Sequence, residues 1–202
     1  MKECQNKTDE QLVLLSLSNE NYFSCLVERY EKSLTRYIFR ISSVTREDAE
    51  DLLQDIFIKA YINLNDFDPR LKFSSWIYRI AHNEVVSFWR KNKARPQLVS
   101  IDDSEFNLIE NLASDLDLLD EMEKLENKKN IKKILLSLKT EYREILVLKY
   151  LEEKSYEEIS DILKKPLGTI ASLISRAKAE FRKRLAENRN RYGEQKPEIG
   201  NQ

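Results

Sequence analysis

Residues 165–178 read KPLGTIASLISRAK, a proline and a glycine directly before a stretch that mixes apolar, small and basic residues. A short helix ending near Leu163, a turn containing Pro166 and Gly168, and a second helix from Thr169 make the layout of a helix-turn-helix. Gly168 is expected to adopt a backbone conformation that other residues resist, and Thr169 to cap the second helix. An ordinary helical hairpin in a bundle is the alternative interpretation.

The second helix of this motif divides into two faces. Ile170, Leu173 and Ile174 are expected to pack inward. The candidates for the exposed face are Thr169, Ala171, Ser172, Ser175, Arg176 and Lys178. Basic residues continue through residues 182–184, and clustered cations favour a phosphate backbone over a partner helix as the target. We therefore expect this helix to enter the major groove of DNA.

The composition of the whole chain indicates an all-α protein. Its 202 residues include only three glycines and four prolines, and 34% of them are charged. No apolar run approaches the roughly 20 residues that span a bilayer, so a cytoplasmic protein without membrane insertion is expected. Cys4 and Cys25 fit a reducing compartment, because no second pair exists to form a disulfide framework. Neither a metal site nor a cofactor is expected.

The net charge of −1 hides a strong asymmetry along the chain. Residues 1–95 carry 15 basic and 14 acidic residues, residues 96–126 carry 1 and 10, and residues 127–202 carry 18 and 11. A basic C-terminal third after an acidic segment suggests a polyanion-binding domain joined by a separate linker.

Helical periodicity organises the N-terminal half. Apolar residues recur at helical spacing over residues 23–41, and the opposite face is expected to carry Arg29, Lys32, Arg36 and Arg40. Thr45 is expected to cap the next helix, with Asp48 as its capping-box partner. Together with a short helix around residues 8–17 and another over residues 76–88, these helices predict a four-helix domain over residues 8–95.

The remainder predicts a flexible acidic linker, a second helical domain and a tail. Periodicity fails over residues 96–117, where acidic residues accumulate. A helical domain follows over residues 118–187, in which Thr140 is expected to cap one helix and Ser155 to open another through a capping box with Glu158. Residues 188–202 are predicted to be a disordered tail.

The predicted helix over residues 76–88 and the basic residues after it combine aromatic rings with cations, a mixture that suits unstacked bases on a charged track. Helix periodicity places Trp76 and Phe88 in the core, so other residues are better surface candidates. The candidate set is Tyr78, Arg79, Asn83, Trp89, Arg90, Lys91 and Lys93. The basic members have a simpler explanation as phosphate contacts, which add affinity without sequence information.

Three motifs in order resemble those of the extracytoplasmic-function (ECF) sigma factors, two-domain initiation subunits of bacterial RNA polymerase. REDAEDLLQDIFIKAY resembles the region-two helix that docks on the β′ clamp helices of core RNA polymerase. FDPRLKFSSWIYRIAHNEVVSFWRK resembles the segment that recognises and opens the −10 promoter element. A third stretch resembles region four, which binds the −35 element and the polymerase β flap. It reads LKTEYREILVLKYLEEKSYEEISDILKKPLGTIASLISRAKAEFRKRL.

The resemblance implies roles for particular residues and partners. By position it assigns polymerase contact to Asp51, Leu52, Gln54, Asp55 and Phe57. It implies promoter DNA as a partner and an anti-sigma factor as an opposing regulator. Ala171 and Leu173 stand where the family often has a basic residue and an arginine, so Arg176 and Lys178 must contribute more of the −35 contact. The linker would thread the RNA exit path of the polymerase or serve simply as a solvated tether.

Two other classes of function are possible from the sequence. A stand-alone helix-turn-helix regulator, with a helical sensing or dimerisation domain, would bind its operator without polymerase. An enzyme is disfavoured because His82 is the only histidine and no nucleophile motif surrounds it. Asp51 and Asp55 share a helix face, but no glycine-rich loop or metal-ligand set accompanies them.

Overall fold

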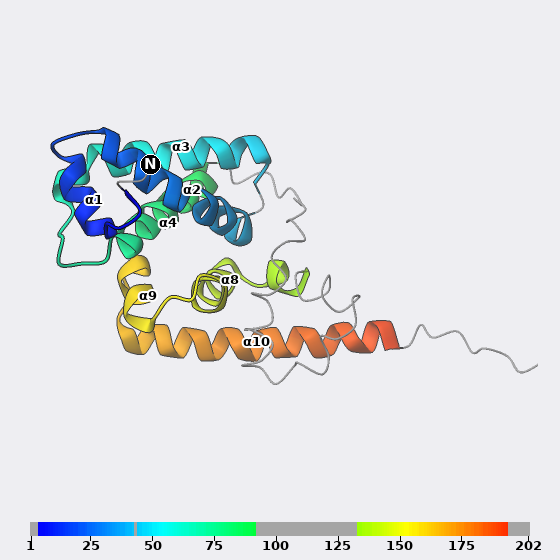
Figure 1. Ribbon diagram of the computed structural model, residues 1–202. Helices are drawn as coiled ribbons and strands as arrows, with labels where there is room; N and C mark the ends of the chain where they lie inside the picture. The colour runs from blue at the N-terminus through cyan, green and yellow to red at the C-terminus, as the bar shows by residue number, and fades with distance from the viewer. Residues whose placement is uncertain (1–3, 43, 92–132, 194–202) are drawn as a thin grey trace, which may run out of the picture. The chain divides into compact units, whose positions relative to one another are not determined.

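The computed structural model describes residues 4–42, 44–91 and 133–193, and the regular elements within these ranges are all helices (Figure 1). The chain separates into two compact units, one of residues 1–101 and 154–167, the other of residues 102–153 and 168–202. The all-α fold predicted from the sequence is therefore confirmed. The acidic linker, Lys93 and residues 118–132 lie outside the described residues.

Four helices form the body of the first unit. They are α1 (Asp9–Ser16), α2 (Asn21–Ile41), α3 (Arg46–Ile62) and α4 (Phe73–Lys91). The turn η2 (Leu64–Asp66) follows α3, and α9 (Tyr156–Leu163) packs against α4 within the same unit. The four helices predicted for the N-terminal half are all present, because each has a continuous apolar face to bury.

Capping boxes fix where three of these helices begin. The hydroxyl of Thr45 accepts the N–H of Asp48 at 3.1 Å, and the Asp48 carboxylate accepts the N–H of Thr45 at 3.4 Å. Ser155 and Glu158 are paired in the same way at the start of α9. Both predicted boxes are confirmed, and Thr8 forms a third with Gln11 before α1.

The core of the first unit is rich in aromatic rings. The Phe73 ring lies 5.5 Å from Tyr30, 5.7 Å from Phe67 and 5.6 Å from Trp76, measured between ring centroids. Trp76 is 7% exposed, which confirms its predicted place in the core. Phe88 is only partly buried, so the same prediction for Phe88 is not met in full.

One arginine of α2 does not lie where periodicity predicts. Arg40 is 1% exposed, whereas the sequence pattern places it on the polar face with Lys32 and Arg36, which are exposed. The last turn of a helix can be covered by neighbouring elements, and the helix's own pattern carries no information about them. The polar-face expectation for Arg40 is therefore wrong.

The second unit contains helical residues 133–137, α8 (Thr140–Leu146), the π-helical segment η4 (Val147–Leu151) and most of α10 (Leu167–Gly193). Thr140 is the first residue of α8 and Lys139 precedes it as the cap, so the predicted capping role of Thr140 is wrong. The buried guanidinium of Arg143 donates to the carbonyl oxygens of Leu136 and Leu138 at 2.5 and 3.2 Å. Burial lowers the pKa of Arg143.

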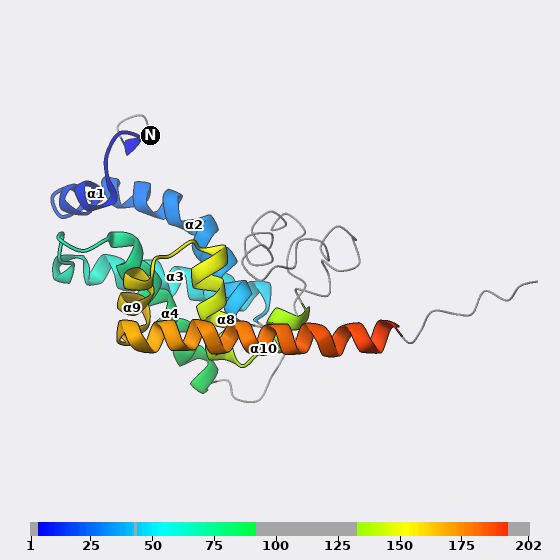
Figure 2. The same ribbon diagram turned by 90° about the horizontal axis from the view of Figure 1, so that it is seen from below.

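The helix α10 begins earlier and ends later than the sequence suggests, and Figure 2 shows it as one continuous rod. Thr169 lies inside its first turn rather than at the cap. Gly168 has ordinary helical geometry, and the left-handed residue of the turn is Lys164, with φ of 51°. At the other end residues 188–193 are helical, so the disordered tail predicted from residue 188 is wrong for these residues.

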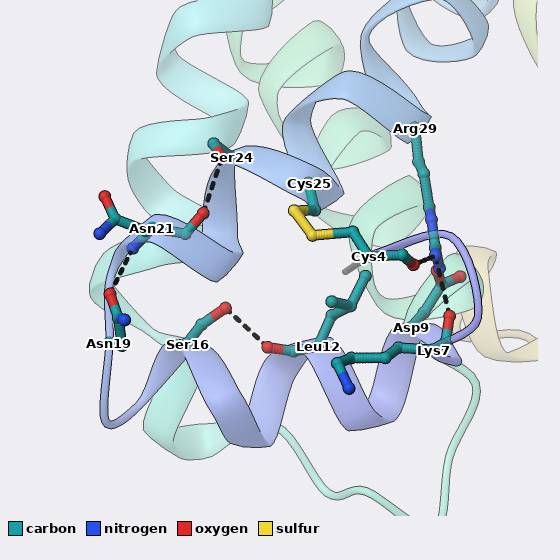
Figure 3. Close-up of a disulfide and its surroundings, with 10 residues drawn as sticks. All are labelled: Cys4, Lys7, Asp9, Leu12, Ser16, Asn19, Asn21, Ser24, Cys25 and Arg29. Carbon is teal, nitrogen blue, oxygen red and sulfur yellow. Dashed lines mark hydrogen bonds and ion pairs between the residues drawn. A yellow bond between two sulfur atoms is a disulfide. The ribbon is translucent and has the colours of Figure 1, made fainter. Parts of the chain in front are cut away.

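The two cysteines form a disulfide in this structure (Figure 3). Cys4 precedes α1 and Cys25 lies in the first half of α2, with their Cα atoms 6.2 Å apart. The sequence pattern places both in a reducing compartment without a disulfide, and no local pattern shows that the fold brings them together. Among the helices that the structure describes, none is both long and apolar enough to cross a membrane.

Candidate nucleic-acid interface

The segment between η2 and α4 forms the first part of the candidate site. Residues 67–72, called here the α3–α4 loop, connect the two elements, and α4 begins at Phe73. Ser75 already lies within α4 and is 3% exposed. The surface available to DNA therefore ends near Lys72.

An ion pair holds the tip of the α3–α4 loop. Both carboxylate oxygens of Asp68 accept from the Arg70 guanidinium, at 2.7 Å for the closest pair of atoms, and Oδ1 also accepts the Arg70 N–H at 3.0 Å. These hydrogen bonds lower the pKa of Asp68 to about 2. The carboxylate is thus ionised at neutral pH and paired with Arg70, two residues along the loop.

The ends of the loop are fixed by the core. Phe67 is 6% exposed and packs on Phe73 and Trp76, with centroids 5.7 and 5.5 Å away. The N–H of Phe73, the first of α4, donates to Glu10 Oε1 of α1 at 3.1 Å. The loop is therefore an exposed segment supported at both ends, an arrangement that suits a surface which must contact DNA without collapsing.

The structure separates the predicted −10 residues of α4 into three groups. Asn83, Arg90 and Lys91 are exposed, and Arg79 and Trp89 are partly exposed. Tyr78 is 2% exposed and lies against the Tyr37 ring at 5.1 Å, so the expectation that Tyr78 is a surface residue is wrong. Lys93 lies outside the described residues.

Acidic residues of α9 pair with one cation of α4 and one of the α3–α4 loop within the first unit. Arg79 Nη1 lies 3.1 Å from Asp161 Oδ1, and Lys72 Nζ lies 3.1 Å from Glu158 Oε1. Burial opposes ionisation of Glu158, but the Ser155 N–H and the Lys72 ammonium outweigh it and lower the pKa. Arg79 and Lys72 are thus paired with carboxylates here, and must exchange these partners before they can contact phosphate.

The face of α3 proposed for polymerase contact is acidic at one end and apolar at the other. Asp51, Gln54 and Asp55 are exposed and Phe57 is partly exposed. Leu52 is 5% exposed, which places it in the core rather than on this surface.

Three exposed apolar residues extend this face, and none of them is among the residues predicted to contact polymerase. They are Ile58, Tyr61 and Ile62, at 54%, 43% and 69% exposure. The signal was available, because residues 51, 55, 58 and 62 follow the spacing of one helix face. An apolar residue on a helix is normally assigned to the core, and only the fold shows that these are not covered.

In α10 the predicted division into two faces is confirmed. Ile170, Leu173 and Ile174 are at most 3% exposed. The exposed members of the predicted −35 set are Ala171, Ser172, Ser175 and Arg176, while Thr169 and Lys178 are partly exposed. The Arg176 guanidinium donates to the Ser172 carbonyl and hydroxyl, each at 3.3 Å, and so lies along the helix surface.

Comparison with protein families gives the class of this fold. A model described as sigma-70 region 2 matches residues 26–95, and a model described as sigma-70, region 4 matches residues 128–181. The first match contains α3, the α3–α4 loop and α4, and the second contains the helix-turn-helix. The two matches place the chain in the sigma-70 class.

Individual relatives narrow the class to a family. The ECF RNA polymerase sigma factor SigW of Bacillus subtilis is 34% identical over 84% of this chain and 91% of that protein. The ECF RNA polymerase sigma-E factor of Escherichia coli K12 is 31% identical over 85% of this chain and 91% of its own length. A solved structure of CnrH in complex with the cytosolic domain of CnrY matches with a TM-score of 0.65 and 25% identity, covering 90% of this chain and 99% of that chain. The chain belongs to the ECF sigma factor family.

Proposed function

We propose that this chain binds core RNA polymerase in the cytoplasm and directs it to promoters, where it contributes to opening the −10 element and catalyses no reaction itself. The observation that carries the proposal is the presence of both sigma-70 regions in one chain, with relatives that cover more than four fifths of it. A stand-alone helix-turn-helix regulator is not favoured, because it leaves the region 2 match without a role.

The α3 face is the proposed docking surface for the β′ clamp helices. Asp51 and Asp55 supply charge that steers association, and Ile58 and Ile62 supply apolar area that is exposed in the free chain. Burying an isoleucine side chain contributes about 2 kcal/mol, so one central contact is worth more than tenfold in affinity.

Replacing Ile62 by aspartate tests this surface. We expect Ile62→Asp to weaken binding to core polymerase at least about tenfold in a fluorescence titration, because it places a charge in an apolar contact. Leu14→Asp is the matched control, since Leu14 is a similarly exposed apolar residue on α1. Equal affinities for the two variants would exclude this part of α3 from the interface.

The α3–α4 loop, with Arg79 and Asn83 behind it, is the proposed −10 site. An exposed loop with fixed ends can receive a flipped base at a small entropic cost, and each captured base contributes roughly 1–3 kcal/mol. The double variant Arg79→Ala/Asn83→Ala should still assemble with core polymerase but form fewer open complexes, measured by permanganate reactivity of the promoter. Unchanged open-complex formation would contradict the assignment.

The exposed face of α10 is the proposed −35 site. Arg176 and Lys178 are its cations, and Ala171 and Ser172 offer small side chains that allow close approach to the groove. Because each phosphate contact releases counterions, loss of one cation should reduce the slope of log affinity against log salt by about 1. The acidic linker and a route through the RNA exit path stay predictions, since residues 96–117 are not described.

An anti-sigma factor is the proposed regulatory partner. CnrH was solved in complex with the cytosolic domain of CnrY, which shows that a related fold can bind a second protein. We propose that an anti-sigma factor competes with polymerase for the α3 face, because its exposed isoleucines are the largest apolar feature of that helix. Competition in the core-binding titration would support this assignment.

A further inference from the structure

The disulfide between Cys4 and Cys25 lies outside every site described above. It joins the segment before α1 to α2 across 21 positions of sequence (Figure 3). Cys4 is partly exposed, whereas Cys25 is 8% exposed. In the cytoplasm, where this chain is proposed to act, a disulfide is usually transient or redox-sensing rather than structural.

A second attachment holds the same segment without depending on redox state. Arg29 Nη2 donates to the carbonyl oxygens of Cys4 and Lys7 at 2.5 and 2.8 Å, and Arg29 Nη1 pairs with Asp9 Oδ1 at 2.6 Å (Figure 3). The start of α1 is thus tied to α2 once covalently and once by a partly exposed ionic contact. Breaking the disulfide removes only the first, so reduction loosens this segment without releasing it.

The position of α1 bears directly on the start of α4. Tyr30 of α2 donates its hydroxyl to Asp9 of α1, and its ring packs edge-on against Phe73. Burial, together with the hydrogen bond to Asp9, raises the pKa of Tyr30, so the hydroxyl remains a donor. Glu10 of α1 accepts the Phe73 N–H, the point where the α3–α4 loop ends. Movement of α1 therefore changes the support of this loop.

We propose that Cys4 and Cys25 form a reversible thiol–disulfide switch that fixes α1 and the first turn of α4 when oxidised and loosens both when reduced. The consequence for promoter opening rests on the proposed function, whereas the structural effect does not. The disulfide state is the one in which the α3–α4 loop is most firmly held.

The reductant is a low-molecular-weight thiol. Its thiolate attacks Sγ of Cys4, the more exposed of the two cysteines, to form a mixed disulfide, and Cys25 leaves as a thiolate. A second thiolate attacks the mixed disulfide and releases Cys4, so two small thiols become one small disulfide. Two electrons pass to the protein and both cysteines take up a proton. Oxidation by the small disulfide reverses each step.

Hydrogen exchange of the full chain in dithiothreitol buffers of graded oxidation tests the structural effect. We expect amides of α1 and the Phe73 amide to exchange about tenfold faster in the reduced form, since local opening becomes easier when one of two attachments is lost. Alkylation and mass spectrometry report the fraction of disulfide in each sample. Equal exchange in the two forms, or no disulfide at any buffer ratio, would overturn the proposal.

Two variants separate the switch from a general loss of stability. Cys4→Ser keeps the backbone carbonyl that Arg29 contacts and avoids the buried Cys25 position; it should exchange like the reduced protein with and without reductant. Glu10→Ala should keep the redox effect on α1 but remove most of it from the Phe73 amide. A redox effect at Phe73 that is unchanged in Glu10→Ala would contradict the proposed route.

Open-complex lifetimes of reconstituted holoenzyme test the functional consequence. The oxidised form should hold the −10 region open several-fold longer than the reduced form, and Cys4→Ser should show no difference. If core polymerase does not bind in either state, the proposed function fails and hydrogen exchange alone decides the switch. If core binds equally and the lifetimes are equal, the function stands and the regulatory consequence is wrong.

Discussion

At the scale of single residues, the Asp68–Arg70 pair offers a measurable property of the α3–α4 loop. The pKa of Asp68 falls from 3.8 to about 2 because the Arg70 side chain and N–H donate to its carboxylate. Because the pKa of Asp68 is lower in the folded state than in the unfolded state, its pairing with Arg70 stabilises the folded state above pH 3.8. This stabilisation is lost as the pH falls through about 2.

This pair predicts a pH titration that can be followed by NMR. The Asp68 carboxyl should titrate near pH 2 in the folded chain, and Arg70→Ala should move its midpoint upward toward 3.8. Arg46→Ala is a suitable control, because Arg46 forms an exposed pair with Glu50 within α3, outside the α3–α4 loop. A midpoint that does not move in Arg70→Ala would show that the loop is held in another way.

At the scale of elements, helix starts in this chain depend on a few hydroxyl groups. Thr45 Oγ1 accepts the Asp48 N–H and thereby satisfies one of the unpaired donors at the start of α3, the helix that carries the proposed polymerase face. Of the helices that the structure describes, three begin with such boxes, and each box is readable in the sequence as a Ser or Thr three residues before an acidic or amide side chain.

Removing the Thr45 cap should destabilise α3. We expect Thr45→Ala to lower the free energy of unfolding by about 1 kcal/mol, measured as a lower urea midpoint at constant slope. Thr35→Ala is the matched control: its hydroxyl donates to the Glu31 carbonyl within α2, so the same chemical change removes no cap. Similar losses in both variants would mean that the box contributes little.

At the scale of the whole molecule, the free energy needed to separate the DNA strands exceeds what this chain can supply without a partner. Separating about ten steps of duplex costs on the order of 14 kcal/mol at about 1.4 kcal/mol per step, whereas one or two captured bases return roughly 1–3 kcal/mol each. The pairing of Arg79 with Asp161 further reduces the positive charge that the first unit offers to DNA. The chain by itself therefore lacks the free energy to open a promoter.

We accordingly expect no promoter opening by the isolated protein. Permanganate reactivity of the −10 region should appear only when core polymerase is added, even at protein concentrations that saturate any duplex binding. A pre-melted promoter with an open −10 region is the control, because it removes the cost of strand separation. Reactivity of an intact promoter with the chain alone would instead support a stand-alone DNA-binding protein.

Much of this architecture could be predicted because it is encoded locally. Helices over residues 23–41 and from Thr45, and the buried face of Ile170, Leu173 and Ile174, follow from apolar spacing and capping chemistry alone. The position of the turn in the helix-turn-helix was predicted correctly, but the residue that adopts the left-handed backbone conformation was not. The left-handed conformation was expected at Gly168, because glycine adopts it most easily. It occurs at Lys164 instead, since α10 begins at Leu167 and Gly168 is already helical.

The sequence by itself determined the all-helical fold, the starts of α3 and α9 and the resemblance to the family, since each depends on residues a few positions apart or on motifs in fixed order. Only the tertiary structure decided that Tyr78 and Arg40 are buried, that Ile62 is exposed and that Cys4 meets Cys25. Burial and pairing of this kind depend on which helix covers which face. The packing of helices on one another minimises the exposed apolar area of a whole folded unit. A short window of sequence does not contain this information.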